Sequence, residues 1–444
     1  MQNKIHSFFL LLLFAMLLCS CSTSRPSASG KKTRHEAYEK KIKDAAPPNG
    51  LGGEWLKAAA IILINPLDIS IPYLEKGSFS EGGANGIGLR FRAKRGQKIN
   101  IHLAKRAPAG YPLYVDLWQP YPVNENKTPR WLAAADTSSL TLEYTAMEDT
   151  VFLVRVQPGI LKKGEYTISI SAGPSLAFPI PQNIKSSVLS FWGDGRDNGG
   201  RKHEGIDILA PKHSPAIACA NGVITRVEEN ALGGKVVYLR PDNAPYSLYY
   251  AHLDSQIAVV NQRVKTGDVI GLTGNTGNAK NTVSHLHFGI YTNKEAVDPL
   301  YFVKNDYKPV PRQEVAEINV NTWMRSGKGT RLYLDQQPGS PNFVALDENT
   351  LVRVEAAAGN YYRVTLPDGQ KGFIAGSFIS STSKPLKRLA IKKSLPLLSI
   401  PEYGGVHKKM LVAGDQINIL ASFKDFYFVN DKDNLQGWVA KHEL

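Results

Sequence analysis

Apolar and polar residues alternate at period two through a long stretch of this chain, between Ile69 and Ser171. The apolar runs include Ile87-x-Leu89-x-Phe91, Ile99-x-Ile101-x-Leu103, Phe152-x-Val154-x-Val156 and Tyr166-x-Ile168-x-Ile170, with glycines and prolines between them. Period two predicts strands with one buried face, and the near-regular spacing predicts an antiparallel sandwich. Because 38 glycines and 27 prolines are spread along the whole chain, we expect a mainly β fold throughout.

Proline-rich junctions and shifts in composition divide the 444 residues into segments. A length of this order allows about three folded domains. We expect a lipoprotein signal peptide at 1–21, a tether at 22–50, an N-terminal β-sandwich accessory domain at 51–175, a central β domain at 176–308 and two C-terminal repeats at 322–383 and 384–444. Short helices are expected at 35–41, inside the tether, and near 54–63.

The N-terminus has the features of an export signal. One lysine precedes an apolar run from Phe8 to Leu18, which is shorter than the ~20 apolar residues of a membrane-spanning helix. The run ends in Leu18-Cys19-Ser20-Cys21, which resembles a bacterial lipobox. We therefore expect a lipid on Cys21 and a protein of the cell envelope, anchored to a bacterial membrane and facing the periplasm. The alternative is ordinary secretion with cleavage near Ser24.

The charge balance narrows the choice of partner. The formal net charge is +14, from 53 Lys and Arg against 39 Asp and Glu. Such an excess suits an envelope polymer, a membrane surface or nucleic acid. Because an exported chain does not meet nucleic acid, we expect peptidoglycan and the membrane as partners. Two of the three cysteines lie in the signal, so no disulfide framework is expected.

The segment from 330 to 444 contains a pattern that repeats after 65 residues. Val352-x-Val354 corresponds to Ile417-x-Ile419, and Gly372-Phe373-Ile374-Ala375 corresponds to Gly437-Trp438-Val439-Ala440. Each copy predicts a strand, an Asp-Gly-like turn and a further strand, and resembles the bacterial SH3-like barrel. Four repeated aromatic residues either fill the barrel cores or line a groove that binds the cell wall: Tyr362, Phe373, Tyr427 and Trp438.

Five of the ten histidines fall between His203 and His287. His203 and Asp207 are four residues apart, so on an extended strand they share a face. His285 and His287 likewise face one side of a strand, and His252 ends an apolar run between the two groups. Each residue alone is more often structural. Together they offer the three nitrogen and oxygen ligands of a catalytic zinc site, namely His203, Asp207 and one member of the pair.

Around these histidines the sequence resembles the lysostaphin/LytM-type zinc metallopeptidases, which cut peptide cross-links of bacterial peptidoglycan. The resemblance runs from about 187 to 299 and includes Phe191-Trp192-Gly193-Asp194, Ala210-Pro211, Ala220-Asn221-Gly222-Val223-Ile224, Tyr250-Ala251-His252-Leu253, Val264-Lys265-Thr266-Gly267-Asp268 and His285-Leu286-His287-Phe288. It implies an antiparallel β fold with a narrow groove, and one zinc ion per chain on His203, Asp207 and His287. His252 and His285 are then the catalytic residues.

The sequence therefore predicts a zinc endopeptidase that hydrolyses peptide cross-links or stems of bacterial peptidoglycan. One of His252 and His285 accepts the proton of the attacking water, and the other hydrogen-bonds the oxyanion; the sequence leaves the two roles open. The alternative is a non-catalytic peptidoglycan-binding lipoprotein that activates another wall hydrolase. The complete ligand set favours the enzyme.

Overall fold

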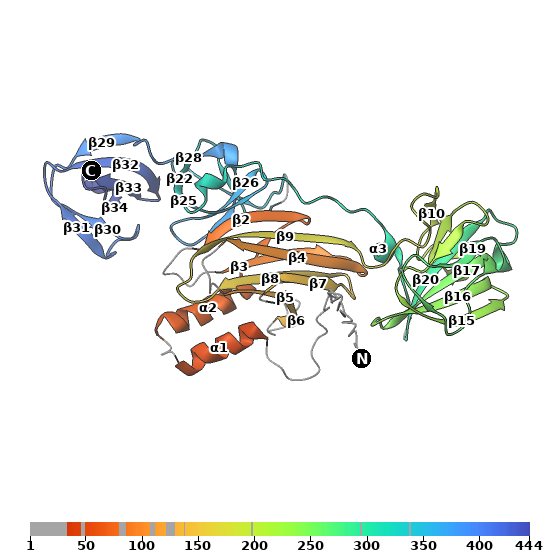
Figure 1. The fold of residues 1–444 in the computed structure, drawn as a ribbon. Coiled ribbons are helices and arrows are strands. Elements are labelled where there is room, and N and C mark those ends of the chain that lie inside the picture. Colours follow the sequence, from red (N-terminus) through yellow and green to blue (C-terminus); the bar gives the residue numbers. More distant parts are fainter. Residues whose placement is uncertain are drawn as a thin grey trace, which may run out of the picture.

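The computed structural model describes residues 33–45, 49–79, 86–106, 112–120, 129–136, 138–196, 199–293, 295–336 and 339–444. Figure 1 shows a mainly β molecule built from several antiparallel sheets, which confirms the predicted fold class. The predicted signal peptide and Cys21 lie outside the described residues. Within those residues, none of the helices is both long enough and apolar enough to cross a bilayer.

The N-terminal part is a sandwich of two sheets, here called the first sheet and the long sheet. The strands of the first sheet, in spatial order, are β1 (Leu67–Asp68), β3 (Ile87–Ala93), β8 (Thr150–Pro158), β5 (Leu113–Gln119) and β6 (Arg130–Ala134). The N-terminal strands of the long sheet are β2 (Tyr73–Phe79), β9 (Gly164–Pro174), β4 (Gln97–Arg106) and β7 (Thr141–Thr145). Their alternating apolar residues, among them Leu89, Ile101, Val154 and Ile168, form one buried core.

The long sheet continues into the first C-terminal repeat, because β2 pairs with β25. The repeat contributes β22 (Trp323–Ser326), β23 (Arg331–Tyr333), β24 (Phe343–Ala345), β25 (Leu351–Ala358), β26 (Tyr361–Thr365), β27 (Lys371–Ala375) and β28 (Ile379–Ser381). Phe373 and Ala358 of the repeat belong to the core of the N-terminal sandwich. The sandwich and the repeat predicted at 322–383 therefore share both a sheet and a core.

The second repeat forms its own sheet but shares a core with the first. Its strands are β29 (Lys387–Ala390), β32 (Gln416–Phe423), β33 (Phe426–Asp431), β34 (Gln436–Ala440), β30 (Leu395–Leu398) and β31 (His407–Leu411). Leu420 and Phe423 of this repeat pack in one cluster with Leu351 and Met324 of the other. The two repeats are thus joined by buried apolar contacts.

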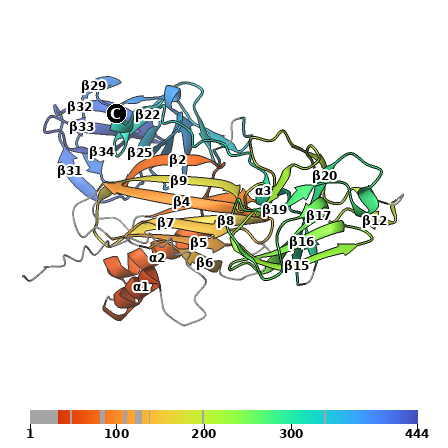
Figure 2. The same ribbon diagram turned by 45° about the vertical axis from the view of Figure 1, so that its right-hand side comes forward.

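Two helices precede the sandwich, α1 (Arg34–Ala45) and α2 (Leu51–Ile64), where the sequence predicts short helices. Figures 1 and 2 show both helices beneath the first sheet. His35 of α1 is buried, and its Nδ1 makes a short contact with Asp116 Oδ2 of β5. Arg155 of β8 donates to the same carboxylate at 2.7 Å. The predicted tether at 22–50 is therefore too long, since 34–45 is a docked helix.

The central domain contains a separate antiparallel sheet. Its strands, in spatial order, are β10 (Ser187–Ser190), β13 (Ile206–Leu209), β20 (His285–Thr292), β17 (Tyr246–Gln256), β16 (Gly234–Pro241), β15 (Gly222–Asn230) and β18 (Arg263–Val264). Strand β19 (Val269–Thr273) pairs with β17 and with β14 (Pro215–Ile217). The helix α3 (Leu300–Val303) follows, and its Phe302 lies in the core of this domain.

Candidate active site

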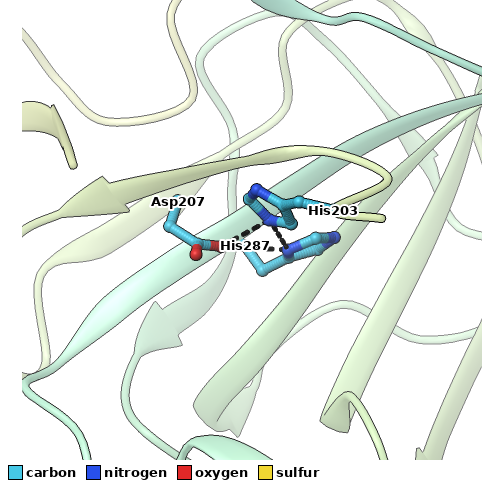
Figure 3. A group of neighbouring side chains, drawn as sticks. All are labelled: His203, Asp207 and His287. Carbon is cyan, nitrogen blue, oxygen red and sulfur yellow. Dashed lines mark hydrogen bonds and ion pairs between the residues drawn. The ribbon is translucent and has the colours of Figure 1, made fainter. Parts of the chain in front are cut away.

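Two adjacent strands of the central sheet bring the motif residues together. Asp207 of β13 lies directly opposite His287 of β20 in the register of the pair. Next to His287, Leu286 and Phe288 enter the core, as the period-two pattern predicts. His203 comes from the segment before β13, where its backbone N–H donates to Asp194 O at 2.8 Å. Figure 3 shows the three side chains pointing toward one another.

The donor atoms of these residues form a compact triangle. His203 Nε2 lies 3.0 Å from Asp207 Oδ1 and 3.0 Å from His287 Nδ1, and Asp207 Oδ1 lies 3.0 Å from His287 Nδ1. An ion at the usual ~2.0–2.1 Å from nitrogen and oxygen ligands can therefore contact all three atoms. Within the described residues, this trio is the group of His, Cys, Asp and Glu side chains that could hold a metal ion. Two imidazoles and one carboxylate fit zinc.

Hydrogen bonds orient the ligands for this task. His203 Nδ1 lies 2.8 Å from Phe191 O, an acceptor, so this nitrogen carries the proton and Nε2 offers its lone pair to the site. Burial by itself would raise the pKa of Asp207, but hydrogen bonds with His203 and His287 outweigh it and hold that pKa well below its ordinary value. The carboxyl group is therefore ionised, as a metal ligand must be.

His252 and His285 flank the triangle. His252 Nδ1 lies 2.9 Å from Thr276 O, and His285 Nδ1 lies 2.8 Å from Val283 O. Since both carbonyls are acceptors, each ring keeps its proton on Nδ1 and has a free lone pair on Nε2. Burial, together with the neighbouring His287 and His285, lowers the pKa of His252 to about 4, so this ring is neutral at pH 7.

A bulge in β17 aims His252 at the site. Tyr250 pairs with Val237 and Leu253 with Lys235, so two residues of β17 oppose one residue of β16. His252 itself has a positive φ of 60°, which few non-glycine residues adopt. Its ring centroid lies 5.0 Å from that of His285 and 5.8 Å from that of His287. The bulge thus places a third strand's histidine beside the ligands.

Gly205 is needed for close packing behind the ligands. A Cβ atom at this position would lie 2.7 Å from His287 Nε2 and 2.6 Å from Phe288 O. Neither the ring nor the backbone carbonyl can yield without moving His287. The glycine inside the His-x3-Asp motif therefore has a packing role.

The five residues open onto a groove with a volume of about 480 Å³. Its lining includes the apolar side chains Leu232, Ala279 and Val283, together with Leu189, Arg196 and Tyr291. Thr282 and Val283, in the segment just before His285, also line the groove. An extended peptide can approach the ligand triangle along this groove.

The four aromatic residues proposed for wall binding lie elsewhere, and three of them require a correction. Tyr362, Phe373 and Trp438 are 3%, 0% and 5% exposed. Phe373 lies in the core shared with the sandwich, and Tyr362 and Trp438 lie in the core that joins the two repeats. Tyr427 is only partly buried and packs against a separate core within the second repeat. The first three do not present a contact surface.

Sequence reasoning missed two residues of the site, Arg196 and Ser190. Arg196 Nη2 donates to Asp207 Oδ2 at 2.6 Å and to Ser190 Oγ at 2.8 Å. Neither residue belongs to a His or carboxylate cluster, and neither has a spacing that marks a ligand. Their contacts with Asp207 and with each other form only in the folded chain.

The antiparallel sheet presents two histidines and a carboxylate to an open groove, with two further histidines beside them. This arrangement is a candidate metal site of the kind that metal-dependent hydrolases use. Residues 201–299 match the profile of Peptidase family M23. This segment of the chain is therefore a peptidase M23 domain.

Known relatives resemble this segment. The L-Ala--D-Glu endopeptidase of Bacillus subtilis (strain 168) is 37% identical over 123 residues, which make up 26% of this chain and 37% of that protein. The peptidoglycan DD-endopeptidase ShyC of Vibrio cholerae is 35% identical over 103 residues, 22% of this chain and 23% of that protein. The solved catalytic domain of lysostaphin from Staphylococcus simulans is 30% identical, with 28% of this chain and 94% of that chain covered and a TM-score of 0.25. This chain therefore spans less than two fifths of the two curated relatives.

Proposed function

We propose that this protein is a zinc-dependent endopeptidase that hydrolyses peptide bonds in the cross-links or stems of bacterial peptidoglycan. The observation that carries the proposal is the triangle of His203 Nε2, Asp207 Oδ1 and His287 Nδ1 with 3.0 Å sides. The substrate class is supported by the M23 match and by relatives named as peptidoglycan endopeptidases.

The chain's own residues supply the remaining chemistry. A zinc ion bound by the three ligands supplies a Lewis acid and a water whose pKa is lowered toward ~7. The free Nε2 lone pairs of His252 and His285 lie on the same groove, so one ring accepts the proton of the attacking water. That ring then passes the proton to the leaving amine. The other ring would have to take a proton from solvent onto Nε2 to donate a hydrogen bond to the developing oxyanion, a contribution of about 3 kcal/mol for one donor.

A first prediction concerns the ligands. His203→Ala or Asp207→Ala removes one donor of three, so both bound zinc and hydrolysis should be lost. Zinc per chain is measured by elemental analysis of purified protein, and hydrolysis by mass spectrometry of fragments from digested peptidoglycan. The matched control is His213→Ala, an exposed histidine that pairs with Asp254 in the same domain, and it should leave both unchanged.

The same measurements on the wild-type protein distinguish an endopeptidase from a non-catalytic activator. Wild-type protein that binds peptidoglycan and zinc but releases no fragments would favour a non-catalytic activator of another hydrolase. Normal zinc content in both ligand variants would refute the assignment of the metal site.

A further inference from the structure

The two oxygens of Asp207 have different partners. Oδ1 faces the donor nitrogens of His203 and His287 at 3.0 Å each. Oδ2 accepts a hydrogen bond from Arg196 Nη2 at 2.6 Å, which is a charge-assisted contact. The two carboxylate oxygens therefore have separate roles. Oδ1 is directed at the ligand triangle, and Oδ2 is bound by the guanidinium group of Arg196.

Arg196 is held in place by a short hairpin and by a serine. Its strand β11 (Gly195–Arg196) pairs with β12 (Arg201–Lys202), with Arg196 directly opposite Arg201. The same Nη2 donates to Ser190 Oγ at 2.8 Å, and Ser190 lies beside Asp207 in the register of β10 and β13. Ser190 Oγ also donates to Asp194 Oδ2 at 2.7 Å. With 30% of its side chain exposed, Arg196 reaches Asp207 from the wall of the groove.

This contact decides how Asp207 can bind a metal ion. A carboxylate ligand binds through one oxygen or through both. Binding through both would require Oδ2 to turn away from Arg196 and to lose a strong hydrogen bond. A catalytic zinc site needs three protein ligand atoms and one open position, and a fourth protein oxygen would fill that position.

We propose that Arg196 is a positioning residue that keeps Asp207 a one-oxygen ligand and so keeps one coordination position open. The inference rests on the proposed function only in requiring that the site binds a divalent metal. Partners that bind a ligating carboxylate from behind are typically worth about 10–100-fold in metal affinity or activity. If charge alone mattered, removal of Arg196 would increase the metal affinity, because a positive charge near the cation would be lost. The two explanations therefore predict opposite changes in affinity.

The test compares Arg196→Gln with Arg201→Gln in the full chain. Arg201→Gln makes the same charge change at the opposite position of the hairpin. We expect Arg196→Gln to weaken zinc binding by about 10–100-fold, measured by competition with a chelator. Its Co²⁺-loaded form should show weaker visible absorption than the wild type, as expected when the coordination number rises. Arg201→Gln should neither weaken zinc binding nor reduce the visible absorption of the Co²⁺-loaded form. Arg196→Lys should restore part of the affinity because it restores a positively charged donor, which glutamine lacks.

Three outcomes would overturn the inference. One is an unchanged zinc affinity and Co²⁺ spectrum in Arg196→Gln. A second is tighter metal binding in both Gln variants, which would show an effect of charge alone. A third is unchanged metal binding with slower peptide hydrolysis, which would assign Arg196 to the substrate. Equal thermal stability of the metal-free variants controls for folding, whereas a wild-type chain that binds no zinc would refute the proposed function itself.

Discussion

Three histidines of the site are each fixed by a backbone carbonyl, and this detail sets their chemistry. His203, His252 and His285 place Nδ1 at 2.8–2.9 Å from the carbonyl oxygens of Phe191, Thr276 and Val283. Because the proton is held on Nδ1, each ring directs its Nε2 lone pair inward. His203 is within the ligand triangle, whereas His252 and His285 stand beside it.

The second prediction follows from this difference in position. His252→Ala and His285→Ala should retain zinc but lose about 10²–10⁴-fold in turnover, because each removes a proton-transfer or oxyanion contact and no ligand. Single-turnover rates on a soluble cross-link peptide and zinc content measure the two effects separately. A variant with near-wild-type turnover would show that its histidine is only structural.

At the scale of elements, a buried ion pair joins the N-terminal sandwich to the first repeat. Glu75 of β2 and Arg363 of β26 are 0% and 2% exposed, and Arg363 Nε donates to Glu75 Oε2 at 2.8 Å. The hydroxyls of Tyr73 and Tyr166 donate to the same carboxylate at 2.7 and 2.6 Å. Burial, followed by the charge of Glu75, raises the pKa of both tyrosines well above the ordinary value, so they remain donors.

The third prediction tests this junction. Arg363→Met leaves Glu75 buried without its cationic partner and should lower the free energy of unfolding by about 3–5 kcal/mol. The double variant Glu75→Gln/Arg363→Met should be less destabilised than Arg363→Met alone, because it removes both charges. Scanning calorimetry of the full chain measures the shifts. The control is Lys76→Met, which breaks an exposed pair with Glu317 and should cost less than about 1 kcal/mol. An equal loss in Arg363→Met and the control would contradict the prediction.

The same junction changes how the C-terminal repeats can be studied. The sequence suggests two separate barrels, yet β25 pairs with β2 and Phe373 lies in the sandwich core. Removal of the repeats would expose both that core and Glu75. A role in holding the enzyme on the wall is therefore better tested with point substitutions at exposed positions than by truncation.

At the scale of the whole molecule, the peptidase domain is docked against the sandwich. Arg95 Nη1 of the sandwich donates to Glu295 Oε1 at 3.5 Å, and a Cβ atom at Gly96 of the sandwich would lie 2.2 Å from the ring of Phe302. Figure 1 shows the peptidase domain at one end and the second repeat at the other, with the sandwich and α1 between them. An anchor that precedes α1 would therefore connect to the middle of the molecule.

The fourth prediction concerns that anchor. Cys21→Ser removes the proposed acceptor thiol, so the variant should move from the membrane fraction to the soluble fraction. Fractionation of cells that express either form, followed by immunoblotting, measures the distribution. Cys19→Ser is the matched control and should remain with the membrane. Persistence of Cys21→Ser in the membrane fraction would contradict lipidation at this residue.

The sequence by itself determined the β class, the positions of α1 and α2, and two residues of the ligand triangle, His203 and Asp207. It left the third open between His285 and His287, and only the family resemblance implied His287. These features can be predicted because strand periodicity and motif spacing depend only on residues that are close in sequence. For example, His285 and His287 share one face of their strand wherever that strand lies in the fold. The pairing of Asp207 with His287 needs only that two such strands become neighbours.

Only the tertiary structure decided the contacts between segments that are distant in sequence or that lack a period. Arg196 lies on the paired strands β11 and β12 and meets Asp207 of β13 only in the folded chain, so no sequence spacing predicts this contact. Arg363 meets Glu75, 288 residues away, because a sheet passes from the sandwich into the repeat. Tyr362, Phe373 and Trp438 of the repeats are core residues for the same reason. Burial depends on which surfaces meet, and that is set by long-range packing of the whole chain.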